Sequence, residues 1–185
     1  MQDEKELVRR AQQRDEVAFS RLYESYFDKI YRYVAFKIGD RTEAEDVTQQ
    51  VFVKVLKAIA TFRWQGLPFS AWLFRIAHNQ VVDYLRKKMK QTTVTLDRPL
   101  QDNSVDPQRA VEQKLEMERV SSAAKRLTQA QQQVLSLRFA GELSVAEAAQ
   151  VMGRSQGAVK ALQHSAIKAL RKILVESEDE ERPGI

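Results

Sequence analysis

The chain has 185 residues, which is enough for one ordinary domain or two small ones. Hydrophobic residues make up 43% of it and charged residues 30%, so we expect a packed core, and the low counts of glycine (6) and proline (4) argue against many tight β-turns. Cysteine is absent, which excludes disulfides, thiolate metal sites and cysteine nucleophiles. The sequence contains no run of about 18 apolar residues, so we expect no membrane span. Met1–Arg10 lacks the apolar centre of a signal peptide, so we expect a cytoplasmic protein.

Positive charge is gathered in two blocks of the chain, whose net charge is +5. Residues 1–90 carry 17 Lys and Arg against 12 Asp and Glu, and residues 107–175 carry 11 against 5. A mildly acidic stretch separates the blocks, and an acidic segment at residues 176–185 follows the second. Basic blocks suggest partners that carry phosphate, although Lys- and Arg-rich surfaces are also common on helical proteins without such partners.

The first part of the chain predicts two helices, because apolar side chains recur there at three- and four-residue spacing. The first helix is expected over Asp15–Ile38, with Gly39 as its C-terminal cap. The second is expected to begin at Thr42, which would form a capping box with Glu45, and to end near Ala60.

A loop, a long helix and a linker are expected next. Thr61–Pro68 contains a glycine and a proline and predicts a loop, and Phe69–Lys88 has a strong helical pattern. Gln91–Pro107 is polar, contains two prolines and has no apolar period, so we expect a flexible linker and the domain boundary there. Beyond it, helices are expected over Arg109–Arg126 and from a cap at Thr128 to about residue 140.

The last helices predict a helix-turn-helix. Ser144 and Glu147 form a capping box that opens a short helix, Gly153 ends that helix, and Ser155 caps a longer helix that runs to about Val175. A short helix, a tight glycine turn and a second helix are typical of the motif that places its second helix in the DNA major groove. The same arrangement also occurs in α-helical bundles that bind no DNA.

The second helix of this pair has two distinct faces at about 100° per residue. Its apolar stripe consists of Val159, Leu162, Ala166, Ala169, Leu170 and Ile173. Its polar face consists of Gln156, Lys160, Gln163, His164, Lys168 and Arg171. Amide groups can recognise adenine and cations can bind guanine or phosphate, so we expect DNA to lie against this face and near the capping residue Ser155.

Aromatic side chains precede a cationic helical face in the first half of the chain. The loop contains Phe62, Arg63, Trp64 and Gln65. On the following helix Arg75, Asn79, Asp83, Arg86 and Lys90 share one arc. Aromatic rings beside cations suit unstacked bases, which predicts a single-strand site. The alternative is that the aromatic side chains of the segment, Phe69 above all, are buried in the core.

Four stretches carry a resemblance to a known family: AEDVTQQVF from Ala44, FSAWLFRIAHNQVVDYLRKK from Phe69, LSVAEAAQVMG from Leu143 and GAVKALQH from Gly157. In these motifs and their order the chain resembles the extracytoplasmic-function (ECF, group 4) sigma factors of bacterial RNA polymerase. The resemblance implies an all-α fold of two small helical domains, region 2 at residues 1–90 and region 4 at residues 108–176. Residues 91–107 would be the linker and residues 177–185 an acidic tail.

The resemblance also implies a mechanism. Region 2 would dock on core RNA polymerase and capture the melted minus-ten strand, and region 4 would bind the duplex minus-thirty-five element. The docking residues would be Asp46, Gln49 and Gln50. The promoter face of region 2 would consist of Asn79, Asp83, Arg86, Lys87 and Lys88, with Phe62–Gly66 as the strand-capturing loop. The implied partners are core RNA polymerase, promoter DNA and an anti-sigma factor.

Two departures from the family pattern concern the expected sites. Gln50 stands where the family usually has glutamate, which removes one charge from the docking face. In the DNA-reading helix, several polar or basic positions of the common family pattern are occupied by other residues, namely Ala158, Ala161, Leu162, Gln163 and Ser165. Lys160 and His164 match the pattern.

Two other functions are alternatives to a sigma factor. A helix-turn-helix regulator that binds duplex DNA without joining polymerase would need neither the docking residues nor the aromatic loop. An enzyme is disfavoured, because the histidines His78 and His164 lie in different expected domains and no metalloprotease motif, phosphate-binding glycine loop or carboxylate cluster is present. We therefore expect no catalytic residues, no metal and no cofactor, and we expect His78 to face solvent.

Overall fold

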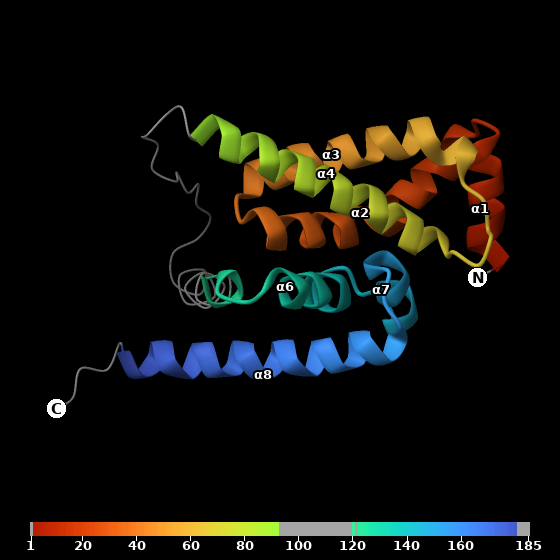
Figure 1. Ribbon diagram of the computed structural model, residues 1–185. Coiled ribbons are helices and arrows are strands. Elements are labelled where there is room, and N and C mark those ends of the chain that lie inside the picture. Colours follow the sequence, from red (N-terminus) through yellow and green to blue (C-terminus); the bar gives the residue numbers. More distant parts are fainter. Residues whose placement is uncertain (1, 93–119, 121, 181–185) are drawn as a thin grey trace, which may run out of the picture.

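The computed structural model describes residues 2–92, 120 and 122–180, and every regular element among them is helical (Figure 1). The first group of helices is α1 (Gln2–Gln12), α2 (Glu16–Ile38), α3 (Arg41–Ala58), the 3₁₀ turn η1 (Ile59–Thr61) and α4 (Phe69–Thr92). The second group is α6 (Gln129–Leu135), the π-helical turn η2 (Ser136–Ala140), α7 (Val145–Met152) and α8 (Gln156–Glu180). The predicted all-α fold is therefore confirmed for the described part of the chain.

Several helices differ in extent from the sequence-based expectation. Helix α1 was not predicted, and α4 continues past Lys88 to Thr92. Helix α8 continues past Val175 to Glu180, so the first residues of the expected acidic tail are helical. The expected linker from residue 93 onward and the helix expected from Arg109 lie outside the described residues, apart from a short helical stretch around residues 122–125.

The caps of α2 agree with the prediction, whereas the cap of α3 does not. Asp15 accepts a hydrogen bond from the Ala18 amide, and Gly39 ends α2 in the left-handed conformation with φ 81°. The capping box predicted at Thr42 is wrong, because Asp40 caps α3 by accepting from the Glu43 amide at 2.8 Å. Asp40 has the extended backbone that an N-cap requires, which places Thr42 inside the first turn.

The caps of the second group agree with the prediction. Capping boxes form at Thr128 with Gln131 and at Ser144 with Glu147. Gly153 ends α7 with φ 62°, and the Ser155 hydroxyl accepts from an amide of the first turn of α8 at 3.2 Å. These four local signals fix the short helix, the turn and the long helix at their expected places. In the described part of the chain, no helix combines the length and the apolar character that a bilayer-spanning segment needs.

The core of the first group lies between α2, α3 and α4. Tyr33 on α2 and Phe74 on α4 are fully buried and meet edge to face, with ring centroids 5.4 Å apart. The hydroxyl of Tyr33 lies 3.1 Å from Nδ1 of His78. The expectation that His78 faces solvent is therefore wrong, because its imidazole is half-buried between α2 and α4 and satisfies a buried phenol.

The two groups of helices are in direct contact. Helix α7 packs against α4, and η2 packs against α2, so that the second group lies along one side of the first (Figure 1). One cluster of buried apolar side chains contains residues of both groups. The pattern of the sequence had predicted two helical units and gave no indication of a contact between them.

The Asp40 cap gives a direct stability prediction. We expect Asp40→Ala to lower the free energy of unfolding by about 1 kcal/mol, because the Glu43 amide loses its acceptor. Thr42→Ala is the matched control and should change it by less than about 0.5 kcal/mol. Urea denaturation followed by circular dichroism measures both; equal losses in the two variants would contradict the cap at Asp40.

The half-buried His78 makes stability depend on pH. Burial and the nearby Lys37 cation lower the pKa of His78 below its ordinary value of 6.5. The unfolded chain therefore binds the proton more readily than the folded chain. The stability that neutral His78 contributes is fully present above its unfolded pKa and is lost as the pH falls through the lower pKa of the folded state. As the pH is lowered from about 7.5 to about 5, we expect the urea midpoint of the wild type to fall. The fall should be smaller in His78→Gln, whereas the control variant His164→Gln should behave like the wild type.

Candidate nucleic-acid interface

Helix α8 presents the polar face that the sequence predicts. The core side of the helix is formed by Val159 and Ala166, which are fully buried, while Leu162 and Ile167 pack against the core from its edge. The opposite side is exposed and carries most of the predicted DNA-reading residues: Ser155, Gln156, Lys160, His164, Lys168 and Arg171. The exposed cations lie along one side of the helix, where they could bind phosphates and guanine edges.

Gln163 differs from its neighbours on this face. Its side chain is half-buried, and its Oε1 accepts a hydrogen bond from Nε of Arg138 at 3.0 Å. Arg138 also donates to the carbonyl of Leu143, so it ties α8 to the turn before α7. Gln163 therefore supports the helix-turn-helix from inside, and its use as a base-reading group would require breaking the bond to Arg138.

The aromatic side chains before α4 form one cluster. Phe62 is only 2% exposed, and its ring lies 5.0 Å from Trp64, 5.5 Å from Phe69 and 5.2 Å from Trp72 between centroids. Phe69 is buried as well, while Trp64 and Trp72 are half-buried. Phe62 thus has no ring face open to a base, and its position makes it the support on which Trp64 rests.

Helix α1 holds the base of this loop, a contact that no pattern in the sequence predicts. Nε2 of Gln12 donates to the carbonyls of Ile59 and Phe62, at 3.1 Å and 2.9 Å. Nζ of Lys5 lies 5.6 Å above the ring of Trp64. The loop is therefore fixed from one side by α1 and from below by the aromatic cluster, while Gln65 stays exposed.

Three side chains of the expected promoter face on α4 are exposed: Asn79, Arg86 and Lys87. Asp83 is half-buried, and its carboxylate lies 4.0 Å from Nζ of Lys54 and 3.8 Å from Arg86. Arg63, in the loop, uses Nη1 to bind the carbonyls of Ala60 and Phe62.

Lys88 is turned toward α3 instead of outward. Its Nζ lies 2.5 Å from a carboxylate oxygen of Glu43 and 5.8 Å from the ring centre of Tyr84. The hydrogen bond to Glu43 raises the pKa of Lys88, and burial together with that carboxylate raises the pKa of Tyr84 to about 12. The charge of Lys88 thus serves the contact between α3 and α4, and the exposed cations of this face are Arg86 and Lys87.

The expected docking residues share the exposed face of α3. Asp46, Gln49 and Gln50 are all exposed, and Gln50 accepts a hydrogen bond from the buried Gln80 at 2.5 Å. The same face continues with two apolar side chains that the sequence analysis did not select, Val53 at 51% and Leu56 at 56% exposure. The sequence could have indicated both side chains, since they fall outside the apolar stripe that faces the core. An exposed apolar pair beside polar groups is typical of a protein contact surface.

Family models match both groups of helices. Residues 22–91 match Sigma-70 region 2, and residues 123–172 match Sigma-70 region 4. Together these matches cover most of α2, all of α3, nearly all of α4, and α6 to most of α8. In the described part of the chain, no three His, Asp or Glu side chains gather as metal ligands would.

Comparison with individual proteins agrees with these matches. The chain is 41% identical over 171 residues to the ECF RNA polymerase sigma factor BldN of Streptomyces coelicolor, covering 91% of this chain and 65% of BldN. It is 34% identical to the ECF RNA polymerase sigma factor ShbA of Streptomyces griseus, covering 73% of this chain and 74% of ShbA. The solved structure of CnrH, in complex with the cytosolic domain of CnrY, matches with a TM-score of 0.72 and 27% identity over 94% of this chain and 98% of CnrH.

These relatives, the two region matches and the helical architecture lead to one conclusion. The chain belongs to the extracytoplasmic-function family of RNA polymerase sigma factors.

Proposed function

We propose that this sigma factor binds core RNA polymerase through α3, captures the melted minus-ten strand with the loop before α4, and binds duplex minus-thirty-five DNA with α8. The observation that carries the proposal is the placement of three surfaces on one small molecule: the exposed polar and apolar face of α3, the Trp64 loop before α4 together with the exposed cations Arg86 and Lys87 further along that helix, and the cationic face of α8. The domain limits expected from the sequence, residues 1–90 and 108–176, remain part of this proposal.

Affinity and selectivity would come from different groups. Exposed cations release counterions from DNA, so the affinity for promoter DNA should fall steeply with salt. Contacts of α8 with base edges, each worth about 1–3 kcal/mol, would distinguish one promoter from another. Stacking on Trp64 would offset part of the free energy that strand separation costs.

Other partners follow from the same family. Sigma factors are DNA-binding initiation factors, and we infer that the chemistry of RNA synthesis belongs to the core enzyme, with no catalytic residue supplied by this chain. CnrH is solved with the cytosolic domain of CnrY, which supports a protein partner besides polymerase. We infer that an anti-sigma factor binds this chain too, and that it acts in the cytoplasm with core RNA polymerase.

The docking face on α3 can be tested by charge reversal. We expect Asp46→Lys to weaken binding to purified core RNA polymerase at least about tenfold, because an exposed carboxylate at the contact becomes a cation. Leu56→Glu should weaken it by a similar factor through lost apolar contact. Fluorescence titration of the labelled chain with core enzyme measures both, and promoter-directed transcription should fall in parallel.

The matched control is Glu24→Lys, which makes the same charge change on an exposed position of α2. Unchanged core affinity in both Asp46→Lys and Leu56→Glu would refute docking through α3. If the wild-type chain binds promoter duplexes but never associates with core enzyme, it is a helix-turn-helix regulator of duplex DNA and the sigma function is wrong.

The strand-capturing role of Trp64 gives a separate prediction. In holoenzyme, we expect Trp64→Ala to reduce open complexes on a duplex promoter by about fivefold or more, since one stacking contact is worth roughly 1–3 kcal/mol. Permanganate reactivity of unpaired thymines measures the open fraction. Trp64→Phe keeps an aromatic ring and should retain most of the open complexes. On a template whose minus-ten strands are already separated, Trp64→Ala should reduce transcription less than on the duplex promoter. Equal open fractions for wild type and Trp64→Ala would exclude the role.

A further inference from the structure

Helix α1 packs beside the turn η1, which leads into the loop that the proposed function assigns to strand capture. The match to region 2 begins at residue 22, so it does not include this helix. We propose that α1 is part of the single-strand site, and that Lys5 moves from the indole ring of Trp64 to the phosphate of a captured nucleotide when its base stacks on that ring. The inference rests on the proposed function and adds to it a group that binds the strand backbone.

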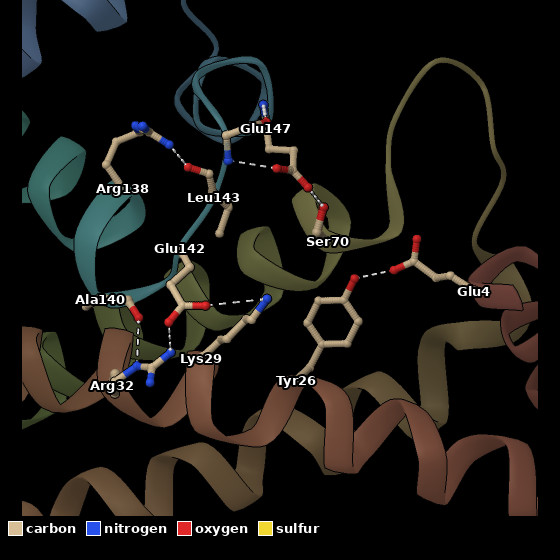
Figure 2. A network of polar contacts seen from close by, with 11 residues as sticks. Glu4, Tyr26, Lys29, Arg32, Ser70, Arg138, Ala140, Glu142, Leu143 and Glu147 are labelled. Atoms are coloured by element: carbon tan, nitrogen blue, oxygen red, sulfur yellow. Dashed lines mark hydrogen bonds and ion pairs between the residues drawn. The ribbon is translucent and has the colours of Figure 1, made fainter. Parts of the chain in front are cut away.

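The first half of α1 is fixed on the rest of region 2. Val8 and Ala11 are buried in the core. Glu4 accepts a hydrogen bond from the hydroxyl of Tyr26, a half-buried side chain of α2 (Figure 2). Burial and this hydrogen bond raise the pKa of Tyr26 above its ordinary value, so the phenol stays protonated and remains the donor. The backbone of Lys5, which follows Glu4, is therefore held in one place.

The end of α1 is joined to the loop that carries Trp64. Nε2 of Gln12 donates to the carbonyl of Ile59 at 3.1 Å and to that of Phe62 at 2.9 Å. The ring of Phe62 in turn meets Trp64 edge-on, with centroids 5.0 Å apart and planes at 75°. Because these contacts connect the helix to the indole ring, Lys5 and Trp64 remain neighbours when a strand approaches.

The ammonium of Lys5 lies where a base would stack. The side chain of Lys5 is exposed, and its Nζ lies over the ring of Trp64, 5.6 Å from the ring centroid. A cation over a partly exposed ring is held only weakly. A stacking base uses the same π-face, and the flexible four-carbon stem of lysine lets the ammonium leave it without a backbone movement. Stacking therefore displaces the ammonium while the helix stays in place.

The other two cations of α1 already have carboxylate partners. Arg9 pairs with Glu6 at 2.6 Å. Arg10 pairs with Asp15 at 2.6 Å, across the turn between α1 and α2. No carboxylate of the described residues forms an ion pair with Lys5. Of the three cations on this helix, Lys5 is thus the one whose charge is available to an anion from outside the chain.

The carboxylates of α1 do not cancel this charge at the loop. Glu4 is bonded to Tyr26, and Glu6 is paired with Arg9. Asp3 is exposed, but it stands two residues before Lys5, which places it about 160° away around the helix at about 100° per residue. An incoming phosphate therefore meets the cation on the side of Trp64.

A captured nucleotide supplies the anion that Lys5 lacks. The phosphate of a stacked nucleotide lies one sugar away from its base, and so close to the ammonium that the base has displaced. Lysine binds phosphate as a point charge, and the contact releases a counterion from the strand. A phosphate contact carries no sequence information, so Lys5 should strengthen the capture of any strand whose base stacks on Trp64.

The test compares holoenzymes on a fork DNA, which is a promoter fragment that the wild type transcribes, with the minus-ten strand left single. Fluorescence anisotropy of the labelled fork gives the affinity between about 50 and 200 mM salt. We expect Lys5→Ala to weaken binding about fivefold, and to reduce the slope of log affinity against log salt by about 0.7, because one phosphate contact is lost. Lys5→Arg keeps the charge and should retain both values.

The matched control is Arg9→Ala, which removes the same charge from the same helix one turn further on, where the cation is already paired. It should weaken binding less than about twofold and keep the salt slope. Equal losses in Lys5→Ala and Arg9→Ala would overturn the inference, because the net charge of α1 would then explain the effect. A loss with an unchanged slope would also overturn it, because Lys5 would then only support the ring.

Two further results for Lys5→Ala would count against the inference. Tighter binding would mean that the ammonium merely obstructs the ring, and unchanged binding would mean that it takes no part in capture. Circular dichroism of each variant shows whether the chain is folded, and the salt slope separates a lost phosphate contact from a general loss of stability.

Trp64→Ala on the same fork separates this inference from the proposed function. If Trp64→Ala weakens the complex and Lys5→Ala does not, the strand-capturing loop stands and the inference for α1 is wrong. If neither variant changes the affinity, strand capture by this loop is wrong as well. If the chain never binds core polymerase, the proposed function is wrong. Titration of the free full-length chain with a short mixed-sequence single strand then decides on Lys5 through the same variants, and absence of binding would overturn the inference too.

Discussion

The phenyl ring of Phe74 is fully buried between the two halves of the molecule. One side packs edge-on against Tyr33 in the core of region 2, with centroids 5.4 Å apart, and another faces the backbone of Gly141 in region 4. A close-packed interior responds to small changes in volume, so this one contact couples the core of region 2 to the position of region 4. The ionic and hydrogen-bonded contacts around it, at Glu142 and Glu147, are geometrically specific but individually weak.

Packing also determines which aromatic side chains remain available to a ligand. Phe62 and Phe69 fill the space between η1 and α4, and Trp64, which is half-buried, packs against Phe62. Gln12 and Lys5, on α1, hold the same loop from the side. A rigid support of this kind lowers the entropy lost when an exposed ring stacks on a base. In the proposed function, the loop is thus held in place by residues, Phe62 and Gln12 among them, that do not themselves contact the DNA strand.

The site residues could be predicted from the sequence where helical periodicity alone decides exposure. The outward position of Lys160, Lys168 and Arg171 follows from the apolar stripe opposite them. Periodicity places a side chain on a face, but it does not identify the neighbours of that side chain. For this reason Gln163 and Lys88, which were expected on DNA-binding faces, instead bond to Arg138 and Glu43.

Local rules were sufficient for most of the secondary structure, because a cap, a left-handed glycine or a 3.6-residue period involves only neighbouring residues. The family could be recognised from the four motifs, since their residues and their order along the chain are properties of the sequence alone. The contact of Gly141 with Phe74 and the pairing of Glu142 with Arg32 join residues more than 60 positions apart. Such pairs are created by the packing of helices whose relative positions no local pattern specifies, so only the tertiary structure revealed that the two regions meet and that Gln150 of region 4 contacts the loop of region 2.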